Sequence, residues 1–278
     1  MEKLPSSHLN VKLIAFDLDD TLLTSGLEIS PATVQAIRKC AERGIYIVLC
    51  SGRTENAILP YVRTLNIAGT QAGRYLISIN GACIIDLHTR LPLRTCKLDG
   101  ETLNTVYKEA SARNLGCHVC DADTIYADRD TEWTRKDSIM CGLKFKCVEN
   151  FSDFLNKGHP KILIPAPEKE VEVFMPQLKQ VLKGRADVFT SKPFFLEVMP
   201  PDCGKGQSVL YLADYLGIPH EQTMGFGDSF NDESLLTLCG YGVAMCNGQE
   251  TIRQKADFVT RKSNDEDGIA DFLENWVL

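Results

Sequence analysis

The chain has 278 residues, of which 44% are hydrophobic and 24% are charged, and its formal net charge is −7. These values are typical of a globular protein with one large domain or two ordinary ones. They exclude a membrane-spanning protein, because no stretch approaches the roughly 20 apolar residues of a span, and they argue against a nucleic-acid partner, because no Lys/Arg run exceeds two residues.

The amino terminus and the cysteines bear on the compartment. Residues Met1 to Asn10 contain no apolar segment of the kind found in signal peptides, so we expect a loose extension there and a cytoplasmic protein. The eleven cysteines are scattered along the chain, and without an export signal we expect them to be reduced thiols.

The first segment that indicates chemistry is the mostly apolar run 11–16, which predicts a buried strand and is followed by two carboxylates, Asp17 and Asp19. Side chains two residues apart in extended chain point the same way, and crowded acids are costly unless a cation or a proton relieves them. The pair therefore predicts a divalent-metal site at the carboxyl end of a strand, where open α/β sheets place their ligands.

Two other interpretations of these acids were weighed. An isolated Asp-x-Asp is most often turn chemistry, so the catalytic interpretation requires partners elsewhere in the chain. A calcium loop of the EF-hand type is disfavoured, because Leu22 stands where that loop needs glycine and a strand precedes it. The residues that fit the calcium-loop spacing are Asp17, Asp19, Thr21 and Glu28.

Strand and helix signals alternate over the next 60 residues. A capping Ser30 and Pro31 predict a helix over 31–43, and Thr54 is positioned to cap a second helix that ends near residue 65. Apolar runs at 45–50 and 75–79 predict two further buried strands, ending in Ser51-Gly52-Arg53 and in Asn80-Gly81. This β-α-β-α-β pattern predicts a parallel sheet.

The pattern changes near residue 84, where shorter alternating strands and two helices predict an inserted α+β domain over residues 84–191. The α/β pattern then returns, with a helix over 205–216 closed by Gly217 and a strand over 223–227 that leads into Asp228. We therefore predict an α/β protein with a Rossmann-like parallel-sheet core, residues 1–83 and 192–278, and an inserted cap.

The loops after these elements, in their order, resemble the four motifs of the haloacid dehalogenase superfamily, and in particular its Cof-type phosphatases. The resemblance spans about Ile14 to Thr260, and Asp20 stands where many relatives carry glycine. The matching segments are Asp17-x-Asp19, Ser51-Gly52-Arg53, Gly204-Lys205-Gly206 and Gly227-Asp228-Ser229 with Asn231-Asp232, supported by Asn80-Gly81-Ala82, Glu197-Val-Met-Pro and Gly242-Val-Ala-Met245.

The resemblance implies a role for each motif residue. Asp17 is expected to be the nucleophile that forms an aspartyl-phosphate, and Asp19 the general acid and base. Lys205 is expected to hold Asp17 and the phosphate together. The implied ligands of Mg²⁺ are Asp17, the backbone carbonyl of Asp19 and Asp228, with Asp232 in support, and the implied substrate-binding residues are Ser51, Gly52, Arg53, Asn80, Gly81 and Asn231.

The implied activity is a magnesium-dependent phosphomonoesterase acting on a small phosphorylated metabolite of the sugar phosphate, FMN or pyridoxal phosphate class. The cap is expected to close over the phosphate site and to set specificity. An alternative within the same superfamily is a phosphotransferase or mutase, which would pass the phosphoryl group to a sugar hydroxyl instead of water.

Overall fold

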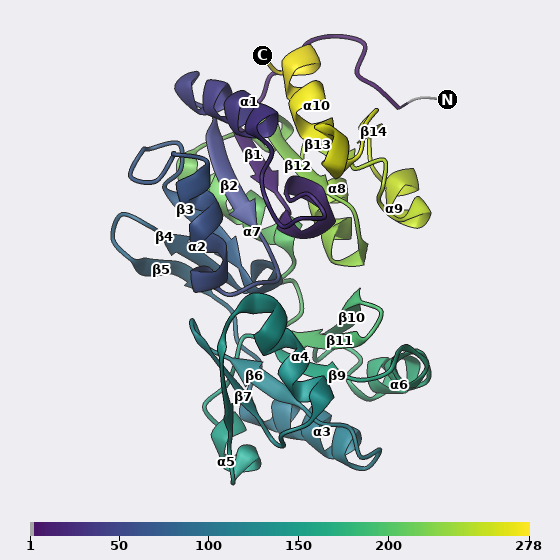
Figure 1. Ribbon diagram of the computed structural model, residues 1–278. Helices are drawn as coiled ribbons and strands as arrows, with labels where there is room; N and C mark the ends of the chain where they lie inside the picture. The colour runs from purple at the N-terminus through teal and green to yellow at the C-terminus, as the bar shows by residue number, and fades with distance from the viewer. Residues whose placement is uncertain (1–2) are drawn as a thin grey trace. The chain divides into compact units, whose positions relative to one another are not determined.

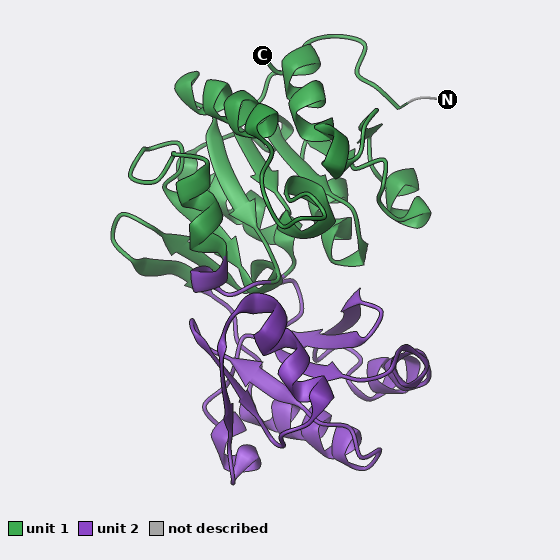
Figure 2. Ribbon diagram, viewed as in Figure 1, with its two compact units in different colours: residues 1–52, 58–94, 204–278 green, residues 53–57, 95–203 purple. Residues whose placement is uncertain are grey.

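The computed structural model describes residues 3–278, which form two compact units (Figure 2). Unit 1 contains the described residues up to 52 together with residues 58–94 and 204–278, and unit 2 contains residues 53–57 and 95–203. Within residues 3–278, every helix is too short or too polar to serve as a membrane span.

Unit 1 is built on an eight-stranded sheet in the order β14-β13-β12-β1-β2-β3-β4-β5 (Figure 1). The strands from β14 to β3 pair in parallel, and β4 pairs antiparallel with β3, which confirms the predicted parallel core. The strands are β1 Leu13–Phe16, β2 Tyr46–Cys50, β3 Tyr75–Ser78, β4 Cys83–Asp86, β5 Leu91–Thr95, β12 Thr223–Gly227, β13 Tyr241–Ala244 and β14 Phe258–Val259.

Helices cover both faces of this sheet, as the unbroken apolar character of β1 requires. Alternate side chains of a strand point to opposite faces. Ile14 and Phe16 join a core with α1, α2 and α10, whereas Leu13 and Ala15 join a second core with α7 and α8. The helices of unit 1 are α1 Pro31–Glu42, α2 Glu55–Thr64, α7 Lys205–Leu216, α8 Glu233–Leu238, α9 Glu250–Lys255 and α10 Gly268–Trp276, with the start of α2 grouped in unit 2.

The helix-boundary predictions hold at Ser30 and at Gly217 and fail in one detail at Thr54. Ser30 accepts a hydrogen bond from the Thr33 amide at 3.2 Å, and Gly217 closes α7 with a φ of 67°. The helix after Thr54 is present, but the Thr54 hydroxyl is buried without a hydrogen-bond partner among the described residues. Its backbone carbonyl accepts from the Ala57 amide at 3.1 Å instead, so the main chain begins this helix without a side-chain cap.

Unit 2 has a six-stranded, mostly antiparallel sheet in the order β10-β11-β9-β6-β7-β8. One face carries an apolar core under α3, α5 and α6, and α4 contacts strands β7, β8 and β9. The segment Asp121–Asp123 joins β6 and β7, which pair antiparallel. The elements are β6 His118–Cys120, β7 Thr124–Ala127, β8 Lys144–Cys147, β9 Ile162–Pro165, β10 Asp187–Lys192, β11 Phe195–Met199, α3 Gly100–Ser111, α4 Glu132–Cys141, α5 Phe151–Leu155 and α6 Glu168–Val181.

The boundaries of the inserted unit differ from the predicted residues 84 and 191. The chain passes into unit 2 at residue 95 and leaves it after residue 203. The reason is strand pairing: β4 and β5 extend the sheet of unit 1, whereas β10 and β11 pair with β9 in the sheet of unit 2. Short alternating strands look alike in sequence whichever sheet receives them.

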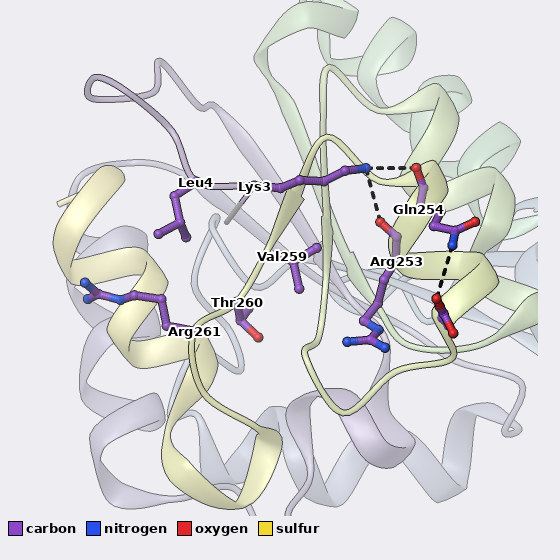
Figure 3. Close-up of a pocket in the computed structure, with 8 residues that line it drawn as sticks. Lys3, Leu4, Arg253, Gln254, Val259, Thr260 and Arg261 are labelled. Carbon is purple, nitrogen blue, oxygen red and sulfur yellow. Dashed lines mark hydrogen bonds between the residues drawn. The ribbon is translucent and has the colours of Figure 1, made fainter. Parts of the chain in front are cut away.

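Residues 3–10 are not the loose extension expected from the sequence. The Val259 amide donates to the Lys3 carbonyl at 2.8 Å, and the Leu9 amide donates to the Trp276 carbonyl at 2.8 Å. The Lys3 ammonium also donates to the carbonyls of Gln254 at 2.8 Å and Arg253 at 3.3 Å (Figure 3). It donates as well to the carbonyl of Ala256 at 2.8 Å, just after α9. A cation at a helix carboxyl end satisfies otherwise unpaired carbonyls, which explains the ordering of this segment.

The expectation that all cysteines are reduced is wrong for one pair. Cys96 and Cys203 form a disulfide, while the other nine cysteines are free. The two residues are 107 positions apart, and they meet because the chain passes into and out of unit 2 at neighbouring points, with Cα atoms 6.7 Å apart. Sequence spacing does not reveal such a pairing.

Candidate active site

The carboxyl ends of four adjacent parallel strands set the site. In the order β12-β1-β2-β3, Phe16 is in register with both Phe226 and Leu49, so these strands end side by side. The rings of Phe16 and Phe226 stack with centroids 5.1 Å apart beneath the ends of their strands. Asp17 directly follows β1 and Asp228 directly follows β12, so the two carboxylates that were 211 positions apart by number become neighbours.

Three carboxylates gather there, with one ligand atom of each within 4.8 Å of the others: Asp17, Asp228 and Asp232. All three are buried, and Asp232 is completely inaccessible to solvent. Carboxylate oxygens are the donors that hard divalent cations such as Mg²⁺ prefer. The donor set therefore fits a magnesium ion, and it brings together residues of the early and late acidic motifs.

Lys205, the first residue of α7, is the cation of this cluster. Its side chain is fully buried, and its ammonium donates to a carboxylate oxygen of Asp17 and to Asp232 Oδ1 at 2.6 Å. A buried ammonium requires such partners, because transferring an unpaired charge out of water costs several kcal/mol. The lysine is thus fixed against the nucleophile candidate.

One ammonium does not balance three buried carboxylates, and the pKa values reflect this. Burial raises the pKa of Asp17 to about 7, with the Asp232 charge adding to the rise and Lys205 opposing it. Burial and the charges of Asp232 and Asp17 likewise raise the pKa of Asp228 well above its usual value. Burial would lower the pKa of Lys205, but the two carboxylates it contacts outweigh burial and raise it. The cluster is therefore short of positive charge.

Asp232 binds Lys205, and it also orders the loop that follows β12. Its Oδ2 accepts from the backbone amides of Asp228 at 3.0 Å and Ser229 at 3.2 Å. Gly227 makes this possible, because a Cβ there would lie 2.5 Å from the Asp232 Cβ. Asp232 therefore supports the geometry of Asp228 in addition to carrying charge.

The turn after β1 brings its residues to the site through an unusual backbone. Asp20 has a φ of 61°, a left-handed conformation that glycine adopts readily and that Asp tolerates better than most residues. This explains why a glycine-preferring position accepts Asp20. The turn also places the Thr21 hydroxyl to donate to Asp228 Oδ1 at 2.9 Å, which links the first and last acidic motifs directly.

A second group of polar residues lies at the ends of β2 and β3. The Asn231 amide donates to Asn80 Oδ1 at 3.1 Å, and a Cβ on Gly52 would lie 2.9 Å from the same oxygen. Ile79, Asn80 and Gly81 all have positive φ, which for the β-branched Ile79 is a true outlier. Backbone strain of this kind is found where a site requires it, and the Ser208 hydroxyl holds the turn by donating to the Gly81 carbonyl at 2.6 Å.

With this geometry, comparison with known proteins becomes informative. The family of haloacid dehalogenase-like hydrolases matches residues 14–273. The chain belongs to this family. It is 30% identical to YxeH of Bacillus subtilis over 96% of this chain and 98% of that protein. It is 27% identical to the HMP-PP phosphatase of Yersinia pseudotuberculosis over 96% of this chain and 95% of that protein.

A solved structure gives the same answer for the fold. A haloacid dehalogenase-like hydrolase from Bacteroides thetaiotaomicron matches with a TM-score of 0.84 and 30% identity, covering 95% of this chain and 98% of that one. The resemblance identified from the sequence motifs is therefore confirmed. The chain is an HAD-like hydrolase, and its relatives support a phosphomonoesterase.

The HAD-like framework brings most of the predicted site residues together and leaves two less defined. Asp17, Asp228, Asp232 and Lys205 form one buried cluster, and Gly52, Asn80 and Asn231 form a second group. Asp19 is partly exposed and lies outside the carboxylate trio, although its charge contributes to the raised pKa of Asp17. Arg53 begins the short segment 53–57 that groups with unit 2.

Two supporting residues were not identified from the sequence as part of the site. Thr21 was considered only as a calcium-loop position, and Ser208 was one helix residue among twelve. The signal for Thr21 was its place in the Asp-rich run, two residues after Asp19. Ser208 carried no sequence signal, because its partner is a backbone carbonyl 127 residues away.

Proposed function

We propose that this HAD-like hydrolase is a magnesium-dependent, cytoplasmic phosphomonoesterase that acts on a small phosphorylated metabolite through an aspartyl-phosphate at Asp17. The observation that carries the proposal is the buried contact between Lys205 and Asp17 inside a trio of carboxylates. A binding module has no need to hold a carboxylate and an ammonium together at the end of a strand while leaving the cluster short of positive charge.

The proposed reaction begins with attack of an Asp17 oxygen on phosphorus, which forms the acyl-phosphate bond and breaks the bond to the leaving alkoxide. A carboxylate about 4 Å from a phosphate dianion is repelled by about 8 kcal/mol at an effective dielectric constant of about 20. Lys205 offsets part of this repulsion, because its ammonium contacts the attacking carboxylate directly. The reaction needs further positive charge on the phosphate.

A divalent cation is the fitting source of that charge. Asp17, the Asp19 carbonyl and Asp228 would hold Mg²⁺, with Asp232 in support. When bound, the ion neutralises charge on the carboxylates and the phosphate oxygens. Asp232 and Thr21 then act as positioning residues, the first through Lys205 and the loop amides, the second through Asp228.

Asp19 is the proposed general acid and base. It protonates the departing alkoxide and afterwards removes a proton from the water that hydrolyses the aspartyl-phosphate. Its partial exposure, in contrast to the buried Asp17, suits a group that exchanges protons with a leaving group and with water. Its position two residues after the nucleophile, with extended backbone at φ −69° and ψ 127°, keeps both acids on one turn.

Substrate contacts are proposed for Ser51, the Gly52 amide and Asn231 at the phosphate, and for Arg53, Asn80 and Gly81 beyond it. Unit 2, residues 95–203, is proposed to be the cap that determines the leaving group. Suitable candidate substrates are sugar phosphates, FMN and pyridoxal phosphate, together with HMP-PP, which is named for a relative.

The test is an assay of the purified chain with p-nitrophenyl phosphate and this panel, with and without Mg²⁺. We expect phosphate release that requires the ion, and an acid-quenched reaction should contain a phosphorylated peptide that includes Asp17. Absence of hydrolysis across the panel, or phosphorylation on another peptide, contradicts the proposal. Formation of a phosphorylated acceptor sugar without phosphate release would identify a phosphotransferase or mutase.

A further inference from the structure

The disulfide between Cys96 and Cys203 lies where the chain crosses between the two units. Residue 95 is the first of the long segment of unit 2 and residue 203 is the last, so the bond joins the two ends of that segment. All eleven cysteines of the chain are accounted for by this pair and nine free thiols. The chain is therefore not a disulfide-rich protein, and its one bond lies at the two points where the chain passes between the units, which we call the crossings.

Each partner is tied to a different structural element. Cys96 lies two residues before Leu98, whose amide donates to the His159 carbonyl at 2.9 Å within unit 2. Cys203 directly precedes Gly204, which caps α7, and Lys205, the first residue of that helix. The disulfide thus joins the two ends of the long segment of unit 2, and the second end directly precedes the helix that carries the buried lysine.

The two sulfurs differ in access. Cys203 is buried, with 1% of its surface exposed, whereas Cys96 is partly exposed and follows an exposed residue, Thr95. A dissolved thiol therefore has an approach to the Cys96 sulfur. Lys97, Pro201 and Asp202, which flank the two cysteines in the chain, are also exposed.

We propose that Cys96 and Cys203 form a reversible redox site whose disulfide state restrains the two crossings and thereby slows turnover. A low-molecular-weight thiolate attacks Cys96, breaks the bond to Cys203 and forms a mixed disulfide, and Cys203 leaves as a thiolate that takes up a proton. A second thiol then releases Cys96 and yields the oxidised small disulfide, so two electrons pass to the protein. The reverse exchange with the small disulfide restores the bond.

The restraint acts through geometry. While the bond is closed, the Cα atoms of residues 96 and 203 are held 6.7 Å apart, and neither crossing can move independently. Segments of this kind are where enzymes absorb the backbone changes of opening and closing, and such motions limit turnover in many enzymes. Reduction frees both crossings, so the reduced enzyme is expected to turn over faster. This activity readout rests on the proposed function, but the existence of the redox site does not.

The experiment compares wild type, Cys96→Ser and Cys147→Ser in buffers of reduced and oxidised glutathione. Cys147 is the exposed free cysteine of unit 2 and serves as the matched control. Denaturing alkylation with mass spectrometry should find nine reactive thiols in oxidised wild type and eleven after reduction, and peptide mapping should place the bond at Cys96–Cys203. Hydrogen exchange near residues 95–99 and 200–204 should increase on reduction.

Activity is then read on the same samples. Reduction should raise the kcat of wild type and Cys147→Ser several-fold and lower their Tm by about 5–10 °C. Cys96→Ser should behave as reduced enzyme in both buffers. Three results would overturn the proposal. They are eleven reactive thiols in wild type in the oxidised buffer, a disulfide between other cysteines, or a redox response in Cys96→Ser equal to that of wild type. If no variant hydrolyses phosphate esters but thiol counts and exchange respond as expected, the redox site stands and the proposed function fails.

Discussion

Two buried groups of charged side chains, one in each unit, differ in how well their charges balance. In unit 1, Asp17, Asp228 and Asp232 face a single ammonium, and the pKa values of Asp17 and Asp228 are raised. In unit 2, Lys161 and Glu197 form an ion pair at 3.0 Å with side-chain exposures of 7% and 2%, and the carboxylates of Glu197 and Asp137 both raise the pKa of Lys161. Both groups are shielded from solvent, so burial alone does not separate them.

A second, partly buried carboxylate of unit 2, Asp137, is also held in its charged form. His118 Nε2 lies 3.1 Å from Asp137, and although burial opposes it, contact with His118 lowers the pKa of Asp137 to about 2. A partnered carboxylate is stabilised in its charged form, whereas the carboxylates of unit 1 are destabilised in theirs. The raised pKa values single out the cluster of unit 1, and we therefore expect that cluster to be the one that binds a cation. Four measurements test that distinction.

Replacing the nucleophile candidate should have the largest effect, because activity should be lost while stability is kept. Asp17→Asn removes the attacking carboxylate, so hydrolysis of p-nitrophenyl phosphate should fall more than about a thousandfold. Because the substitution also relieves repulsion among the carboxylates, the metal-free Tm should be unchanged or higher. The neighbouring exposed Asp20→Asn is the control and should remain close to wild type in activity. A tenth of wild-type turnover in Asp17→Asn, as an order-of-magnitude limit, would rule out this nucleophile.

Breaking the Lys161–Glu197 pair of unit 2 should instead lower the stability of the protein. Lys161→Met leaves Glu197 buried without its ammonium partner, and removal of one member of a buried pair typically costs about 3–5 kcal/mol. Urea unfolding should show this loss, and adding Glu197→Leu should recover most of it. A single variant as stable as wild type would show that the pair does not contribute as described.

Magnesium should stabilise unit 1 by relieving its excess negative charge. At an ion concentration of about 100 Kd, binding to the folded state adds about 2.7 kcal/mol, which appears as a higher Tm. Asp228→Asn should lose most of this shift, whereas Asp20→Asn should keep it. Equal shifts in Asp228→Asn and wild type would place the ion elsewhere, and EDTA reversal provides the control for specific binding.

The smallest expected effect concerns a carboxylate of unit 1 that is fully partnered. Arg74 donates to Asp86 through Nε at 3.1 Å and Nη2 at 2.6 Å, and these hydrogen bonds hold the pKa of Asp86 well below its usual value of 3.8. A depressed pKa contributes stability above the unfolded-state pKa that is lost as pH falls. Asp86→Asn should therefore lower the Tm by a few degrees at pH 7, and the difference from wild type should shrink below about pH 4. A difference independent of pH would contradict this assignment.

The strand signals of the sequence indicate which residues end at one edge of the sheet, whereas they do not indicate where one unit passes into the next. Asp17, Ser51, Asn80 and Asp228 each follow an apolar run, and in a parallel sheet the ends of such runs meet at one edge. That rule is local and needs only the strand signals. It places the backbone ends but not the contacts, so the donation from Thr21 to Asp228 required the fold.

Features that depend on distant pairing were missed for a common physical reason. Whether β4 and β5 join one sheet or the other is decided by partners outside their own sequence, and so are the Cys96–Cys203 bond and the Lys3 contacts with α9. Thr54 shows the reverse limit, since a favourable cap residue was present but the main chain supplied the bond. Local preference fixes an element's existence more reliably than its partners.

The parallel pairing of β1 with β12 has a consequence for synthesis on the ribosome. Leu13 is in register with Thr223, and the Leu9 amide reaches Trp276 near the very end of the chain. The amino-terminal strand therefore stays unpaired on one side until β12, which begins at residue 223 of 278, has emerged. The contiguous segment 95–203 meets no such delay and is expected to complete its own sheet first. In nascent chains stalled before residue 223, we therefore expect segment 95–203 of unit 2 to resist protease and the amino-terminal part of unit 1 to be cleaved.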